Sequence, residues 1–191
     1  MGSMIGYHPT ILTHISYCHD FSKYSHAQPF ISAAISVCDN AEKVPPGPLL
    51  LDRVQEFMPL RADIHGLQAA IATEIGDSVY AVEYAHKQFN LQIQLANRQM
   101  TQKVVKAHTD LAMALMVSGR YDDAGAVLDE VGDAAATQDG DGSIHLQQKT
   151  VFARAWLAYL NNNLDEAWDL FSALKRERES ILGVNDRQGV L

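Results

Sequence analysis

Three alanines in this chain are separated by one fixed interval, and a glycine or an asparagine precedes each of them by five residues. The interval is 43 residues, and the recurring positions are Ala81, Ala124 and Ala167, preceded by Gly76, Gly119 and Asn162. A fixed interval of this size is typical of helical repeats, in which each unit is a helix pair too small to bury its own apolar face. The spacing therefore predicts an all-α chain of stacked helix pairs.

The residues around each alanine fit a turn between two helices. Glycine and asparagine tolerate the left-handed backbone that ends a helix. Acidic side chains follow in the first turn of the next helix, where the positive end of the helix dipole favours them: Asp122, Asp123, Asp165 and Glu166. The alanine lets the two helices approach closely, and apolar residues four and seven positions later continue the buried face, as at Leu128 and Val131.

The same pattern divides the chain into four units. The first copy runs over residues 21–27, and the second unit, with Ala85 and Gln88 after its alanine, is the weakest match. We expect units at residues 11–40, 60–99, 103–137 and 144–182 within one domain that covers residues 4–191. Residues 1–3 are interpreted as a cloning remnant, and residues 185–191 as the start of a further helix. Prolines at 45, 46 and 48 predict a loop between the first two units.

The motif resembles the tetratricopeptide repeat. The segments that carry the resemblance are Leu111-Ala112 and Leu115 before Gly119, Gly119-Arg-Tyr-Asp-Asp-Ala124 and Asn162-Asn-Leu-Asp-Glu-Ala167. The period is longer than the family's usual one, and is similar to the long-helix variety of kinesin light chains and of fungal multi-repeat proteins. Gln68 and Arg154 depart from the pattern, because leucine is usual there. The resemblance implies a right-handed superhelical solenoid of antiparallel helix pairs that serves as a protein-interaction scaffold.

In such a solenoid the first helix of each pair lines a concave groove. The resemblance places these side chains there: Lys106, Thr109, Asp110, Met113, Met116, Lys149, Phe152, Trp156 and Tyr159. Methionines and aromatic rings beside two lysines would suit an apolar or acidic peptide segment of a partner protein. The alternative is that these rings pack against neighbouring helices.

Composition and charge argue against other classes of protein. The net charge of −8 disfavours a nucleic-acid surface, and no apolar stretch is long enough to cross a membrane. Cys18 and Cys38 fall at offsets that disfavour a disulfide, and reduced thiols fit a cytoplasmic or nuclear location. We therefore expect protein or peptide partners inside the cell.

Motifs for chemistry are weak or missing. The best metal candidates, His14, Cys18 and His19, have generic spacing. Asp139, Asp141 and Ser143 alternate as calcium ligands do, but the glycine and glutamate of a calcium loop are missing. Phosphate-loop, zinc-protease and serine-hydrolase motifs do not occur. We expect no enzyme activity, no catalytic residues, no cofactor and no metal, and an enzyme or a metal-binding helical domain remains the weaker alternative.

Trp168 lies on the face of its helix that should receive the next unit. A solenoid normally ends in a polar capping helix, so an apolar face at this end needs a cover. We expect either that the chain is part of a larger intracellular protein or that copies associate through this end. Self-association is thus the second hypothesis for function, beside peptide binding.

Overall fold

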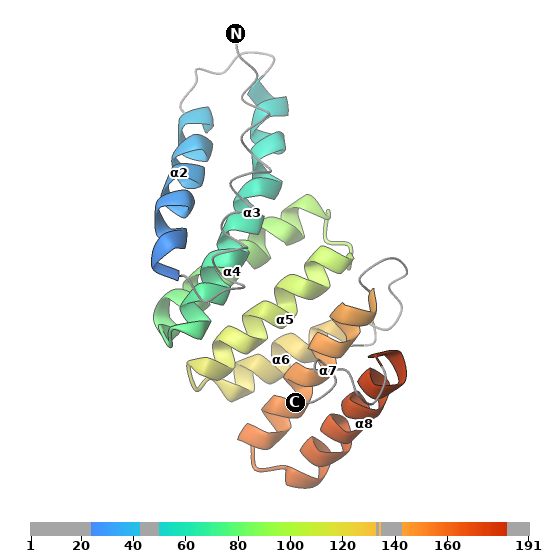
Figure 1. Ribbon diagram of the computed structural model, residues 1–191. Helices are drawn as coiled ribbons and strands as arrows, with labels where there is room; N and C mark the ends of the chain where they lie inside the picture. The colour runs from blue at the N-terminus through green and yellow to red at the C-terminus, as the bar shows by residue number, and fades with distance from the viewer. Residues whose placement is uncertain (1–23, 43–49, 133, 135–142, 183–191) are drawn as a thin grey trace. The chain divides into compact units, whose positions relative to one another are not determined.

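All regular structure in the described part of the chain is helical, as shown by the computed structural model in Figure 1. The structure describes residues 24–42, 50–132, 134 and 143–182. These residues form seven helices and no strand, which confirms the all-α prediction. The chain divides into two compact units, Met1–Gln99 and Met100–Leu191. A right-handed superhelix of four pairs stays a prediction.

The first unit contains α2 (Tyr24–Glu42), α3 (Leu50–Glu74) and α4 (Ser78–Leu95). Helix α2 packs on α3 through an apolar cluster of Ile31, Ala34, Cys38, Leu60 and Ile64. Beside this cluster, Arg61 Nη2 lies 2.8 Å from Asp39 Oδ1. Helix α3 begins at Leu50, ten residues before the start expected for this unit. The segment between the first two expected units is therefore helical from Leu50 onward.

The second unit contains α5 (Gln102–Val117), α6 (Tyr121–Val131), α7 (Ser143–Leu160) and α8 (Leu164–Leu182). The α5–α6 and α7–α8 pairs are hairpins, and α7 packs against both α5 and α6. Helices α5 and α7 run parallel, since Val105 meets Leu146 in one core cluster and Thr109 Oγ1 lies 3.2 Å from Thr150 Oγ1. Two helix pairs are therefore stacked in this unit.

Three hairpin turns share one backbone geometry. Gly76, Gly119 and Asn162 have positive φ angles of 78°, 77° and 60°. In each turn the next amide donates to the carbonyl five residues earlier, and the N···O distances are 2.8–2.9 Å: Asp77 to Ala72, Arg120 to Leu115, and Asn163 to Ala158. This is the Schellman pattern, which uses carbonyls that a helix end leaves without partners. The turn positions and the buried Ala81, Ala124 and Ala167 are confirmed.

Some sequence predictions concern residues that the structure leaves undescribed. These are the side chains of the first repeat copy (residues 21–27), the proline loop, the acidic segment at 139–141 and the further helix at 185–191. Cys18 and the histidines near it also lie outside the described residues. Cys38 is buried.

Small residues bring α3 and α4 together, and Gly66 makes the closest approach. A β-carbon at Gly66 would lie 2.7 Å from Nε2 of Gln88, whose side chain is buried. We expect Gly66→Ala to lower the free energy of unfolding by about 1 kcal/mol, because overpacking outweighs the gain in helix propensity. Urea unfolding followed by circular dichroism would measure the change.

Gly125 supplies a matched control for this prediction, because a β-carbon there would meet Leu157 at an ordinary 3.6 Å. Gly125→Ala should be neutral or stabilising. In a Gln88→Ala background, which removes the obstructing amide, Gly66→Ala should also become stabilising. A loss of stability that persists in that background would show that Gln88 is not the cause.

Candidate functional site

Asp110 on α5 connects two lysines on neighbouring helices. Its Oδ2 lies 2.6 Å from Nζ of Lys106, one turn earlier on α5, and its Oδ1 lies 2.5 Å from Nζ of Lys149 on α7. The side chain of Asp110 is 10% exposed, whereas the lysines are about half exposed. One carboxylate thus holds two ammonium groups close together at the surface.

The two lysines determine the charge state of Asp110. Burial alone would raise the pKa of its carboxyl, but the positive charges and hydrogen bonds of Lys106 and Lys149 outweigh burial. The pKa therefore lies below its ordinary value of 3.8, and the carboxylate is ionised at neutral pH.

A row of aromatic rings lies along α7. The ring of Phe152 stacks on that of Trp156, with centroids 6.2 Å apart, and Trp156 lies 5.7 Å from Tyr159. Phe171 of α8 meets Phe152 edge-on at 5.8 Å. Phe152 is half-buried, whereas Trp156 is 38% and Tyr159 is 53% exposed. The rings pack against each other and still present an apolar surface, and the binding of a partner to them stays a prediction.

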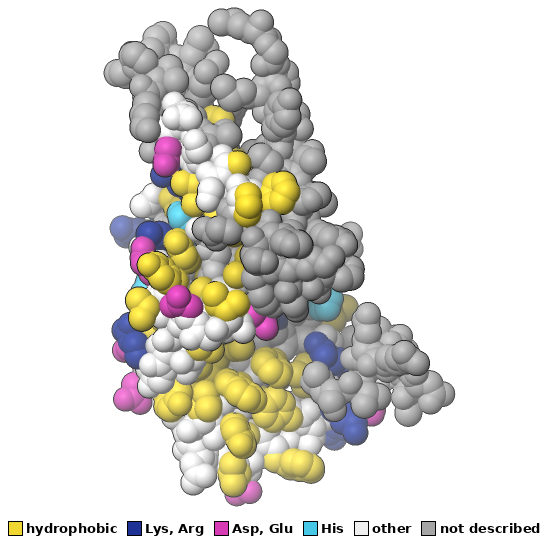
Figure 2. All heavy atoms as spheres, turned by 60° about the vertical axis from the view of Figure 1, so that its left-hand side comes forward, with side chains coloured by type: hydrophobic (Ala, Val, Ile, Leu, Met, Phe, Trp, Pro, Cys, Tyr) yellow, Lys and Arg dark blue, Asp and Glu magenta, His cyan; other side chains and the backbone are white. Residues whose placement is uncertain are grey.

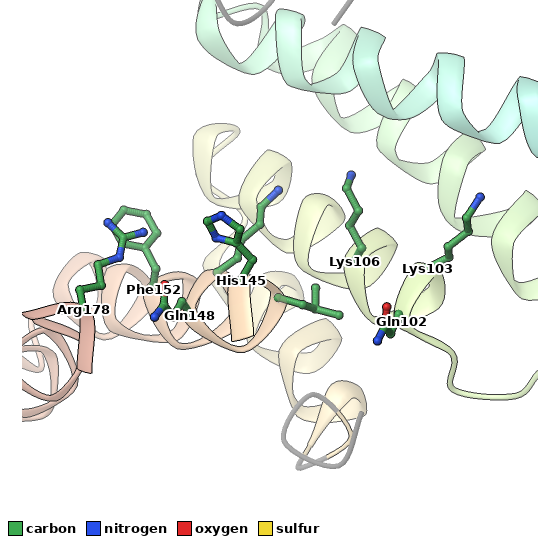
Figure 3. A pocket seen from close by; sticks show the side chains of 9 residues that line it. Gln102, Lys103, Lys106, His145, Gln148, Phe152 and Arg178 are labelled. Atoms are coloured by element: carbon green, nitrogen blue, oxygen red, sulfur yellow. The ribbon is translucent and has the colours of Figure 1, made fainter. Parts of the chain in front are cut away.

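Phe152 also lines a pocket of about 650 Å³ between α5, α7 and α8 (Figure 3). This volume is within the range of ligand pockets, roughly 300–1,000 Å³. The side chains of Lys103, Lys106, His145 and Phe152 extend to the same side of their helices in Figure 3. The described residues that line this pocket are Gln102, Lys103, Lys106, His145, Leu146, Gln148, Lys149, Phe152 and Arg178. We call it the α5–α7–α8 pocket.

The charge of this pocket differs from that of the chain. Among the residues that the structure describes, its lining includes three lysines and one arginine and no acidic side chain, while the chain has a net charge of −8. Asp110, directly behind two of the lysines, offsets one of these positive charges. The pocket therefore favours negatively charged ligand groups.

The structure brings together most of the residues predicted for the groove, in two groups joined by Phe152. Lys106, Asp110 and Lys149 form the first group, and Phe152, Trp156 and Tyr159 the second. Met113 is half-buried on α5. Met116 is only 3% exposed, and Thr109 is fully buried against Thr150. These two side chains therefore belong to the core between helices, and they are not available to a partner.

Sequence reasoning missed Lys103, His145 and Arg178. Lys103 precedes Lys106 by three residues and His145 precedes Lys149 by four, so each lies on the same helix face as its predicted neighbour. Arg178 comes from α8, whose Phe171 meets Phe152 of α7, and it also lines the pocket.

Arg154 is explained by a neighbouring helix end. Its Nη2 donates to the carbonyl of Gly132 at 3.0 Å and to that of Leu128 at 3.3 Å, at the C-terminal end of α6. A leucine could not donate to these carbonyls, which lie at a helix end where side-chain donors often complete the hydrogen bonding, although the Gly132 amide also donates to Leu128 at 3.4 Å. The departure from the repeat pattern at this position thus has a structural purpose.

Hydrophobic side chains are exposed elsewhere in the second unit. Trp168 is 73% exposed at the start of α8, and Leu164, one turn before it, is also exposed. Figure 2 shows hydrophobic side chains gathered on the lower part of the face in view, at the level of the second unit in Figure 1. The exposure of Trp168 agrees with an uncovered apolar face there. Self-association through this face stays a prediction.

The first unit carries its own exposed aromatic group. The ring of Tyr84 stacks between those of His65 and Tyr80, with both centroid distances 5.9 Å. Lys87 Nζ lies 5.1 Å from the centre of the Tyr84 ring. Burial, together with Lys87 and Arg61, lowers the pKa of His65 despite its hydrogen bond to Gln68. The α5–α7–α8 pocket lies in the other unit, so these rings offer a control surface.

Metal sites and membrane-spanning helices are both missing from the part of the chain that the structure describes. No three histidine, cysteine or carboxylate side chains in it are placed to hold a metal ion. None of the seven helices combines the length and the apolar character that crossing a bilayer requires.

The class of protein that the described residues define is an all-helical protein built from packed helix hairpins. No family model matches the chain, and no curated protein or solved structure matches it either. The α5–α7–α8 pocket and the aromatic row beside it are therefore the features of the molecule that indicate a function.

Proposed function

We propose that the chain is a protein-interaction module that binds a peptide segment of a partner protein across α5 and α7. The observation that carries this proposal is the continuity of two surfaces at Phe152, which lines the basic pocket and begins the aromatic row. A segment lying along α7 would meet positive charge at one end and apolar rings at the other.

The chemistry of the aromatic row supports a peptide ligand. Trp and Tyr are enriched among the residues that contribute most to binding energy, because they offer a large apolar area with few rotatable bonds. Ring contacts with Phe152 and Tyr159 already fix the orientation of Trp156. Little side-chain entropy would therefore be lost when a partner covers this ring.

A test requires a ligand selected by the chain itself. The immobilised protein would select from a degenerate pool of short peptides, and the enriched sequences would be synthesised for affinity measurement by calorimetry. A Phe152→Ala, Trp156→Ala double variant should bind these peptides at least tenfold more weakly, because it removes the centre of the aromatic row. The helix content of the variant would be checked by circular dichroism.

Tyr80→Ala provides the control for this experiment, since Tyr80 is an exposed aromatic residue of the other unit. It should leave the affinity unchanged. If the pool yields no binding sequence, or if the double variant binds as well as the wild type, the proposal fails.

Self-association is the alternative, and the observation that favours it is the exposure of Trp168 and Leu164. This function would be preferred if sedimentation shows a stable oligomer that Trp168→Ala dissociates and that the double variant leaves intact. Our main proposal also includes an intracellular location, membership of a larger protein and the absence of catalysis.

A further inference from the structure

The most specific feature of the α5–α7–α8 pocket is the pair of ammonium groups held by Asp110. Both Nζ atoms are within hydrogen-bond distance of one carboxylate, so an anion on the pocket side can reach both. Each ammonium has three N–H donors, and a hydrogen bond to Asp110 uses one of them. The pair is therefore pre-positioned by a partly buried carboxylate on α5.

Further positive charge surrounds this pair. Lys103 and His145 lie one turn nearer the helix starts, on the same helix faces as Lys106 and Lys149. Both lie in the first turns of α5 and α7, which begin at Gln102 and Ser143. The N-terminal end of a helix dipole adds positive potential at such a position. Lysine charges and two helix ends thus act in the same direction.

We propose that this pocket recognises a phosphorylated side chain in the partner peptide. The phosphoryl group binds between Lys106 and Lys149, with Lys103 beside it, and the adjoining apolar residues of the peptide lie over Phe152 and Trp156. This inference rests on the proposed function and adds the chemistry of the ligand.

Charge and geometry favour a phosphoryl group over a carboxylate. Three lysines and Arg178 line the pocket, so with Asp110 the local excess among the described residues is three positive charges. A phosphoryl group carries nearly two negative charges at neutral pH and has three acceptor oxygens. Asp110 already shows that two carboxylate oxygens are engaged by Lys106 and Lys149. A phosphoryl group has a third oxygen that can accept a hydrogen bond from a further donor of the lining, which a carboxylate in the same position lacks.

Three matched degenerate peptide pools would test the inference, with phosphoserine, serine or glutamate fixed at the central position. Enriched sequences would be synthesised in all three forms. We expect the phosphoserine form to bind about tenfold more tightly than the glutamate form. Lys149→Gln should remove most of this difference and leave the affinity for the serine form unchanged. Lys106→Gln should act in the same way, which guards against a folding defect in one variant.

Lys175→Gln is the charge-matched control. Lys175 is an exposed residue of α8, and its Nζ lies 3.7 Å from Oε1 of Glu179. It is not among the residues that line the pocket. This variant should keep the wild-type preference for phosphoserine, although it changes the net charge by the same amount.

The outcomes separate the inference from the proposed function. If the three peptide forms bind equally, with affinities that depend on Phe152 and Trp156, the phosphoryl preference is wrong and peptide binding stands. If no pool yields a ligand, both are wrong. Inorganic phosphate would be titrated as a competitor. If the concentration of phosphate that displaces the peptide equals the dissociation constant of the peptide, the pocket is a free-phosphate site and the inference fails.

Discussion

Replacing Arg154 by methionine is expected to lower the free energy of unfolding by about 2–3 kcal/mol. Methionine keeps the length and apolar stem of the side chain but donates no hydrogen bond. The carbonyls of Leu128 and Gly132 would then lose a charged donor at 3.3 Å and 3.0 Å. A hydrogen bond to a charged group contributes about 1.5–3 kcal/mol. The Leu128 carbonyl would keep only the Gly132 amide as a donor, at 3.4 Å. Urea unfolding followed by tryptophan fluorescence suits the measurement, because Trp156 and Trp168 both belong to the second unit.

Arg176→Met is the control for this prediction. Arg176 is exposed on α8, and its Nε donates to the Ser172 carbonyl of its own helix at 3.2 Å. Its replacement should change stability by less than about 0.5 kcal/mol. Equal effects of the two substitutions would show that Arg154 does not stabilise the end of α6 through these bonds.

The hairpin turns could be predicted from the sequence because their physics is local. A left-handed residue is needed where a helix ends and reverses, and glycine or asparagine meets that need at low cost. Gly76, Gly119 and Asn162 occupy this conformation as predicted. The alanines five residues later are buried for the related reason that two helices of a hairpin must approach closely there.

Residues that depend on packing between hairpins could not be predicted in the same way. Met116 faces the core instead of a surface, because the face that α5 exposes depends on where α6 and α7 lie. Arg154 interrupts the repeat pattern since its partners are carbonyls of α6, 22 and 26 residues away in sequence. Neither the burial of Met116 nor the hydrogen bonds of Arg154 can be recognised in the repeat pattern of the sequence.

In the candidate site, too, some residues could be predicted from local sequence, whereas others depend on packing between helices. Phe152, Trp156 and Tyr159 share one helix, so helical spacing was enough to predict their row. Arg178 reaches the pocket only because α8 folds back along α7, and its sequence neighbours are exposed charges. The role of Asp110 was also missed, because its second lysine is 39 residues away.

Replacing Asp110 by asparagine should destabilise the protein by about 1–2 kcal/mol at neutral pH, and the loss should depend on pH. The carboxyl pKa in the folded protein lies below 3.8, the value expected when unfolded. A depressed pKa stabilises the folded state above the unfolded value, and this stabilisation is lost as pH falls through the folded value. The wild type should therefore exceed Asp110→Asn in stability by a constant amount above about pH 5, and by progressively less below pH 3.8.

Urea unfolding across this pH range would measure the effect, with Asp169→Asn, an exposed residue of α8, as the control. The control should show a difference below about 0.5 kcal/mol at every pH. Added salt should reduce the Asp110 effect only in part, because Asp110 is partly buried while its two lysines are half exposed. A difference between wild type and Asp110→Asn that does not change with pH would contradict the charge argument. It would mean that Asp110 stabilises the second unit through shape and neutral hydrogen bonding, since asparagine has nearly the same shape but no charge.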